Sequence, residues 1–157
     1  MNKTLLIYQT KKGMTKKLMN LLNDSIGHGD VYNLKDFNGQ LDEYDAVIIG
    51  TPVYVGHINK QIKKWINKHY SHLKNKRVGV CLCGMNNKEE ALVIKNNFTD
   101  EQQQLFHIQY LGGAYYFDKL NFMQKFMIKK ITGETEAREV IQQDKIDLFI
   151  KQMTISS

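Results

Sequence analysis

The sequence has little proline, cysteine or tryptophan, with one, two and one of these residues among 157. It also has no uninterrupted apolar run near the roughly 18 residues that a membrane-spanning helix needs. The first segment, MNKTLLIYQTKKG, turns to lysines soon after Tyr8. We therefore expect neither a membrane anchor nor a signal peptide. Because no linker, repeat or low-complexity tract interrupts the chain, we expect one domain over residues 1–157.

The two cysteines, Cys81 and Cys83, lie two positions apart inside an apolar run. In a strand, this spacing places both side chains on one face rather than pointing toward each other. The spacing is not CxxC, and no second cysteine pair completes a zinc site. We interpret both as buried structural thiols, expect no metal site, and expect a cytoplasmic, reducing compartment.

The charge balance is positive, with 22 Lys and Arg residues against 16 Asp and Glu and a net charge of +6. This modest excess favours anionic partners or membrane surfaces at low salt, and we expect no nucleic acid partner. Four lysines gather near apolar residues at helical spacing, which predicts a basic amphipathic helix over residues 121–131. They are Lys119, Lys125, Lys129 and Lys130. The helix could contact an acidic substrate, a partner or an anionic membrane, or it could simply pack on its own domain.

The hydrophobic pattern alternates between short buried strands and amphipathic helices. We predict strands at residues 4–8, 31–34, 46–50, 77–83 and 107–111, the last ending at Gly112 and Gly113. Helical spacing follows over residues 18–26, 58–66, 91–94 and 144–153, with Asp144 placed to cap the last helix. This alternation predicts an α/β three-layer sandwich with a five-stranded parallel sheet in the order 2-1-3-4-5.

The first strand runs directly into a helix through a loop that could hold an anion. The loop is Thr10, Lys11, Lys12, Gly13, Met14 and Thr15. Free backbone N–H groups and the helix dipole favour a phosphate here, and Thr10 and Thr15 can each donate a hydrogen bond. The alternative is ordinary helix capping by the same residues. The loop has neither the GxxxxGK[ST] nor the GxGxxG pattern.

This loop resembles the phosphate loop of flavodoxins, T/S-x-T-G-x-T, in which Lys12 replaces the middle threonine. The loop after the third predicted strand is also similar to that family's second flavin-contacting loop, G-[AST]-P-x-Y-x-G. It consists of Thr51, Pro52, Val53, Tyr54, Val55 and Gly56. The resemblance implies FMN as cofactor, with Tyr54 stacking on the flavin ring. His57 follows as either a proton donor or an exposed residue at a helix start.

The family's third contact follows the fourth strand, where this sequence has Cys83, Gly84, Met85 and Asn86. The aromatic and acidic residues common there in flavodoxins are missing. With fewer negative charges nearby, reduced flavin would be destabilised less, which predicts a higher redox potential. The resemblance identifies no catalytic residue.

Over further stretches, the sequence is similar to one subgroup of this family, the flavodoxin-like, quinone-linked protoporphyrinogen dehydrogenases. These stretches are residues 55–57, 126–129 and 133–136. The sequence therefore leaves three functions open. They are an FMN electron carrier with a redox partner protein, an oxidoreductase that passes electrons from an organic substrate such as a porphyrinogen to quinone, and a cofactor-free binding module. The second function would fit peripheral association with the inner face of the membrane.

Overall fold

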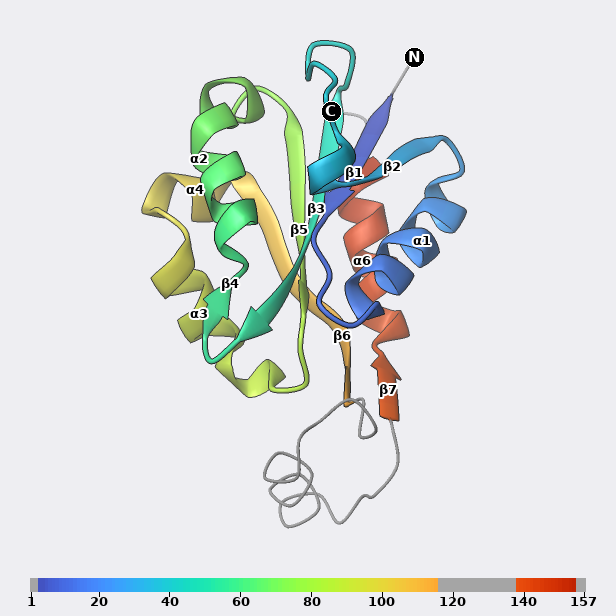
Figure 1. The fold of residues 1–157 in the computed structure, drawn as a ribbon, viewed down its shortest axis with the longest axis vertical. Helices are drawn as coiled ribbons and strands as arrows, with labels where there is room; N and C mark the ends of the chain where they lie inside the picture. Colours follow the sequence, from blue (N-terminus) through green and yellow to red (C-terminus); the bar gives the residue numbers. More distant parts are fainter. Residues whose placement is uncertain (1–2, 116–137, 155–157) are drawn as a thin grey trace.

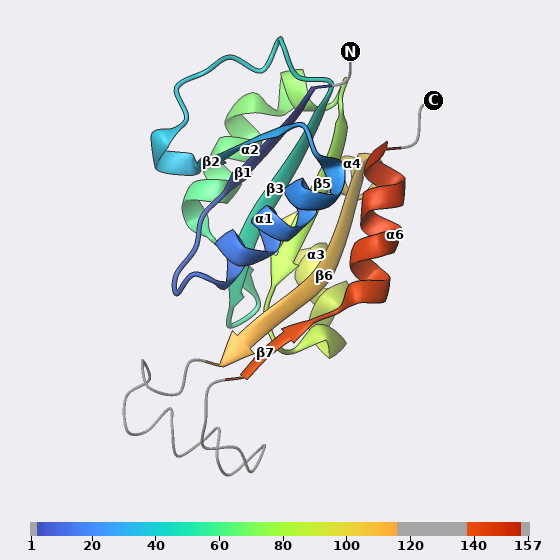
Figure 2. The same ribbon diagram turned by 90° about the vertical axis from the view of Figure 1, so that its right-hand side faces the viewer.

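The computed structural model describes residues 3–115 and 138–154. Within these ranges a sheet is flanked by helices on both faces (Figures 1 and 2). The strands are β1 (Thr4–Tyr8), β2 (Gly29–Asn33), β3 (Ala46–Tyr54), β4 (His57–Ile58), β5 (Arg77–Cys83), β6 (Phe106–Tyr115) and β7 (Arg138–Ile141). The helices are α1 (Met14–Ile26), α2 (Lys60–Leu73), α3 (Glu90–Asn97), α4 (Asp100–Leu105) and α6 (Gln143–Thr154), with short 3₁₀ turns η1 (Leu34–Asp36) and η2 (Asn87–Glu89).

The sheet has the order β2-β1-β3-β5-β6-β7, and β4 pairs with β3 off this path. Along this path, neighbouring strands pair in parallel as far as β6. Strand β7 runs antiparallel to β6, and β4 runs antiparallel to β3. The α/β class and the helix layers are therefore confirmed, and the five predicted strands, observed as β1, β2, β3, β5 and β6, pair in parallel in the predicted order. The sheet is nevertheless mixed, because β4 and β7 add two antiparallel strands that were not predicted. Strand β4 has two residues and β7 has four, too few for either to produce a recognisable alternation in the sequence.

Each face of the sheet carries its own apolar cluster. On one face, α1 and α6 cover side chains such as Leu6 and Ile48, and Phe149 of α6 is fully buried there. On the other, α2, α3 and α4 cover Leu5, Ile7 and their neighbours. Successive side chains of β1 point to opposite faces, which is why its apolar run is continuous rather than alternating.

Several helix starts differ from expectation. Ile58, which was expected in a helix, belongs to β4, and α2 begins at Lys60. Helix α6 begins at Gln143, so Asp144 lies in the first turn and is not the cap. Helix α4 was not predicted; Thr99 begins it with a capping box to Gln102. The predicted helix over residues 121–131 lies outside the described residues. None of the helices in the described ranges is long and apolar enough to cross a membrane.

Strand β3 is longer than the sequence indicated, since it continues through Pro52 to Tyr54 where a loop was expected. Its pairing with β1 ends at Tyr8 and Gly50. Pro52 lies beyond this point and pairs only with Cys83 of β5. One side of β3 is therefore free of a strand partner at Pro52, which is the kind of position where a sheet tolerates proline.

Candidate functional site

The three predicted loops meet at the carboxyl edge of the sheet. There they surround a cavity of about 220 Å³. Strands β1 and β3 lie side by side, but the chain leaves them in opposite directions, toward β2 and β5 respectively. Ligands of open α/β sheets bind at such a switch point. The cavity is lined by Thr10, Lys11, Lys12, Met14, Thr15, Pro52, Val53, Cys83, Gly84, Met85 and Ala114.

The first loop ends in a helix start that has no side-chain cap. Gly13 occupies the cap position with a φ of 97°, which only glycine adopts easily, and the first turn of α1 contains no acidic residue. The Thr10 hydroxyl accepts a hydrogen bond from the Gly13 N–H at 2.9 Å, and its own proton remains available to donate. The backbone N–H groups of the first turn and the helix dipole therefore favour an anion at this end of α1.

Thr15 lies beneath this loop, with only 1% of its surface exposed. Burial raises the pKa of the Cys83 thiol to about 11, and a hydrogen bond from the Thr15 hydroxyl opposes this rise. The hydroxyl thus already has a partner within the protein. Cys81 and Cys83 are both free and buried, as the sequence predicted. Among the described residues, no group of three or more His, Cys, Asp or Glu side chains could hold a metal ion.

The second loop is a tight hairpin between β3 and β4, in which Tyr54 pairs with His57. The two residues between them, Val55 and Gly56, have φ values of 49° and 77°. Positive φ at both positions is the geometry of a type I′ turn, which is strained for a β-branched valine. Tyr54 and Val55 are 62% and 78% exposed. Tyr54 stands at the rim of the cavity region, where the Nζ atom of Lys11 lies 4.3 Å from the centre of its ring.

Two buried polar residues support this hairpin from behind. Asn97 of α3 donates from its amide to the Gly56 carbonyl at 2.9 Å and accepts from the Ile58 N–H at 3.2 Å. Thr51 accepts from the Asn59 N–H at 2.9 Å and is fully buried. Thr51 therefore holds the hairpin in place and does not line the cavity. Sequence reasoning missed Asn97, because nothing in the sequence pairs α3 with a turn forty residues earlier.

The third loop follows β5 and packs closely on β6. The Gly84 N–H donates to the Gly112 carbonyl at 2.9 Å. At Gly113, an added Cβ atom would lie only 2.3 Å from the Gly84 carbonyl oxygen, so this approach requires glycine. Strand β6 therefore does not end at its glycines but continues through them. This continuation places Ala114, which the sequence analysis missed, in the cavity wall.

The remaining predicted residues lie outside the cavity lining. They are Gly13, Thr51, Tyr54, Val55, Gly56 and Asn86. His57 belongs to strand β4 and is exposed, so its expected place at a helix start was wrong. The charged residues in the lining are Lys11 and Lys12, and no acidic side chain is among them. Among the described residues, the site therefore carries positive charge beside a helix start that has no side-chain cap.

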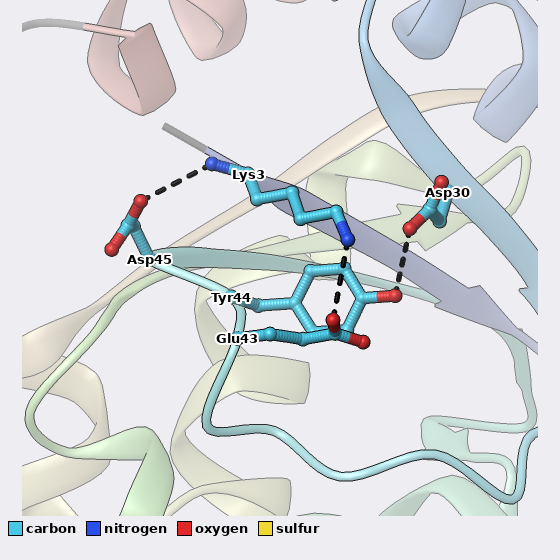
Figure 3. A network of polar contacts seen from close by, with 5 residues as sticks. All are labelled: Lys3, Asp30, Glu43, Tyr44 and Asp45. Atoms are coloured by element: carbon cyan, nitrogen blue, oxygen red, sulfur yellow. Dashed lines mark hydrogen bonds and ion pairs between the residues drawn. The ribbon is translucent and has the colours of Figure 1, made fainter. Parts of the chain in front are cut away.

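A larger cavity of about 800 Å³ lies at the opposite, amino edge of the sheet. Two of its lining residues, Tyr44 and Asp45, belong to a polar network. Tyr44 donates to Asp30 at 2.8 Å, the Lys3 N–H donates to Asp45 at 3.2 Å, and the Lys3 side chain pairs with Glu43 (Figure 3). This network joins Lys3, directly before β1, to β2 and to the segment before β3. Because no parallel strand ends at this edge and the network ties neighbouring segments together, we assign the network a structural role.

The comparisons with known proteins agree with this geometry. Protoporphyrinogen IX dehydrogenase [quinone] of Escherichia coli strain K12 is 23% identical to this chain, in a match that covers 90% of this chain and 88% of the enzyme. A short-chain flavodoxin associated with a bacterial microcompartment has a TM-score of 0.60 at 13% identity, covering 98% of this chain and 97% of its own. A flavoprotein of Lactobacillus acidophilus, solved in complex with FMN, has a TM-score of 0.50 at 22% identity, covering 69% and 90%.

These structural likenesses establish the fold, and the sequence match establishes the family. Residues 5–140 match the family described as Flavodoxin domain, which is most of the chain and includes all three loops at the carboxyl edge. The chain belongs to the flavodoxin domain family.

Proposed function

We propose that this chain is an FMN-binding flavoprotein that exchanges electrons through a flavin held at the carboxyl edge of the sheet. The observation that carries the proposal is the convergence of three loops on one cavity beside an uncapped helix start. FMN, when bound, supplies the redox chemistry, and the protein supplies binding, orientation and charge.

The residues present fit the two ends of FMN. The phosphate would be held by the N–H groups at the start of α1, by the Thr10 hydroxyl and by Lys12. The ring would lie between the hairpin and the third loop, against Val53 and Met85 and with Tyr54 at its rim. A cavity of about 220 Å³ is smaller than the roughly 300–1,000 Å³ of most ligand sites, so part of the ring would be exposed. An exposed ring edge suits electron exchange with a partner.

Titration with two flavins tests the proposal and separates the two ends of the site. Riboflavin has the ring but lacks the phosphate. The Lys12→Gln variant should therefore weaken FMN binding by about tenfold, the scale of one charge-assisted hydrogen bond, and leave riboflavin binding unchanged. Flavin fluorescence measures both affinities. Lys95→Gln, a matched change at an exposed helix position of α3, is the control.

Absence of FMN binding at micromolar concentration would contradict the proposal and favour a cofactor-free binding module. Tighter binding of FAD than of FMN would contradict the assignment of the first loop, since the loop lacks a pyrophosphate motif. Equal loss of FMN and riboflavin in Lys12→Gln would place the phosphate elsewhere.

A second function, transfer of electrons from an organic substrate to quinone, is favoured by the relation to the Escherichia coli enzyme and by one position in the fold. Ala114 of β6 lines the cavity, and the segment 116–137 begins two positions after Ala114. The sequence of this segment contains the lysines that predicted a basic helix. We propose that these lysines face an acidic substrate, or an anionic membrane that holds quinone.

Replacement of residues 116–137 by a two-residue Asn-Gly turn tests this second function. Strands β6 and β7 form an antiparallel pair at this point, which such a turn can join. Quinone reduction by the flavin-loaded protein, with protoporphyrinogen as donor, should be lost while FMN affinity stays within about twofold. Retention of this activity in the shortened chain would leave the electron carrier as the function.

A further inference from the structure

Helix α2 presents a row of lysines on its exposed side. Lys60, Lys63, Lys64 and Lys68 are all exposed, and we call these four residues the α2 ridge. The chain contains no aspartate or glutamate between Asp45 and Glu89. The net charge of the whole protein is only +6, so a large share of the excess is concentrated on this helix.

The arrangement is unfavourable for the helix itself. Lys60 and Lys64, and again Lys64 and Lys68, are four positions apart, where like charges repel. The first turn of α2 carries lysines and no acidic residue, against the direction of the helix dipole. The helix is stabilised instead by buried Ile62, Ile66 and Leu73 and by the Asn59 cap, which accepts from the N–H groups of Gln61 and Ile62. The ridge therefore does not stabilise the helix on which it lies.

None of the four lysines has an ion pair within the part of the chain that the structure describes, where the ion pairs are Lys3–Glu43 and Lys17–Glu139. The positive field reaches neighbouring groups. Burial is the main cause that lowers the pKa of His69, and Lys68 and His72 lower it further. Among the described residues, the ridge is thus a positive surface without an ion-pair partner.

The ridge begins beside the candidate flavin site. Lys60 follows β4 by two residues, and β4 closes the hairpin that carries the exposed Tyr54 and Val55. Figure 1 shows α2 rising from this hairpin along the outer face of the sheet. From Lys60 to Lys68 the helix advances about 12 Å. A molecule seated on the ridge would therefore also reach the rim of the cavity.

Acidic residues border the ridge on both sides. On one side, the start of α4 with Asp100 and Glu101 is tied to α2 by a hydrogen bond from Gln102 to Asn67 at 3.2 Å. On the other, Asp42 shares a cavity with His69 and His72. A flat anionic bilayer laid on this face would meet these acids as well as the lysines. A protein of limited contact area can match the narrow positive row alone.

We propose that the α2 ridge is the docking surface for a small acidic electron-carrier protein, which exchanges electrons with the flavin at the adjoining hairpin. This inference rests on the proposed function for the electron step, although docking itself requires only the charges. Steering by complementary charge raises association rates and weakens as salt screens it.

The test uses an acidic plant-type [2Fe–2S] ferredoxin as the probe. Calorimetry measures its binding to the full chain without added flavin, and stopped-flow absorbance measures electron transfer from the reduced probe to the FMN-loaded chain. The triple variant Lys60→Gln, Lys64→Gln, Lys68→Gln should weaken binding and slow transfer by about tenfold at low salt. It should also flatten the dependence on salt. The matched control, Lys35→Gln, Lys95→Gln, Lys151→Gln, removes the same charge from exposed sites elsewhere and should change both by less than about twofold.

The readouts separate the two proposals. If calorimetry shows ridge-dependent binding but no FMN binds, the docking surface stands and the flavin function fails. Failure of the probe to bind, or equal losses in the two triple variants, would overturn the docking surface. Ridge-dependent sedimentation with anionic phosphatidylserine vesicles, combined with unchanged ferredoxin binding, would also overturn it and assign the ridge to a membrane.

Discussion

The Nζ atom of Lys11 lies 4.3 Å from the centre of the Tyr54 ring, joining the first loop to the tip of the β3–β4 hairpin. A cation–π contact at an exposed site contributes about 0.5–1 kcal/mol. Stacking of a flavin ring on Tyr54 would bury more surface than this contact does, so the ring can displace the lysine at small cost. The first loop and the hairpin are therefore in direct contact at the edge of the candidate site.

Substitution of the Tyr54 ring should weaken both flavins. We expect Tyr54→Leu to reduce the affinity for FMN and riboflavin by about five- to tenfold, because aromatic stacking contributes about 0.5–1.5 kcal/mol beyond area burial. Tyr54→Phe keeps the ring and should bind within about twofold of the natural chain. Fluorescence titration measures both. Unaltered affinity in Tyr54→Leu would remove the hairpin from the site.

Relief of the strained hairpin should stabilise the protein. Val55 has a φ of 49° and is 78% exposed, so its replacement sacrifices little burial. Val55→Asn creates the Asn-Gly pair that type I′ turns prefer and should raise the free energy of unfolding by about 1 kcal/mol. Urea denaturation measures the gain. The control is Val55→Ile, which keeps the β-branch and should change nothing; a gain of the same size in that variant would argue against strain.

Loss of the Asn97 amide should loosen the hairpin from behind. Its three hydrogen bonds reach Gly56, Ile58 and Val93. Asn97→Ala leaves the carbonyls of Gly56 and Val93 and the N–H of Ile58 without this partner and should cost about 1–3 kcal/mol of stability. Flavin affinity should fall in the same variant, since the turn beside Tyr54 is no longer held. Asn20→Ala, at an exposed position of α1, is the control for stability. A fall in stability without a fall in flavin affinity would show that the hairpin position is held independently.

Alkaline pH should destabilise the fold. The pKa of Cys83 is about 11 in the folded chain against 9.0 for an ordinary thiol, and that of Tyr110 is about 12 against 10.0, both mainly through burial. The unfolded chain therefore loses these protons first. The stability that the neutral groups contribute is complete below about pH 9 and is lost as pH rises toward 11 and 12. Urea midpoints should fall between pH 8.5 and about 10.5, and Cys83→Ser, which does not titrate in this range, should fall less.

The sequence predicted the parts of the fold that apolar runs define. Strand β5 was predicted with its bounds as observed, and the buried residues of β1 and β3 follow from uninterrupted apolar segments. The cavity lining likewise contains most of the first loop, because the order of strand, glycine and helix already determines where the loop lies. Local pattern was sufficient where a segment's own residues determine its structure.

The missing parts depend on contacts between distant segments. Strand β7, with the sequence REVI, is a strand because β6 lies beside it. Pro52 suggested a loop. Strand β3 can contain this proline because its pairing with β1 already ends at Gly50, which the sequence does not show. Asn97 resembles any polar residue near a helix end until its partners at Gly56 and Ile58 are known. No periodicity in the sequence records such pairings.

The antiparallel pairing of β6 with β7 has a thermodynamic consequence for the residues between them. Tyr115 and Arg138 are paired across the ladder, so the two points where residues 116–137 leave and rejoin the sheet are neighbours. The entropy cost of closing a connection grows slowly with its length, by about 0.6 kcal/mol for each doubling. Insertions and deletions at this point therefore change the stability of the sheet little. Since this point lies beside the candidate flavin site, it is where relatives of this protein could acquire a new substrate without altering the core.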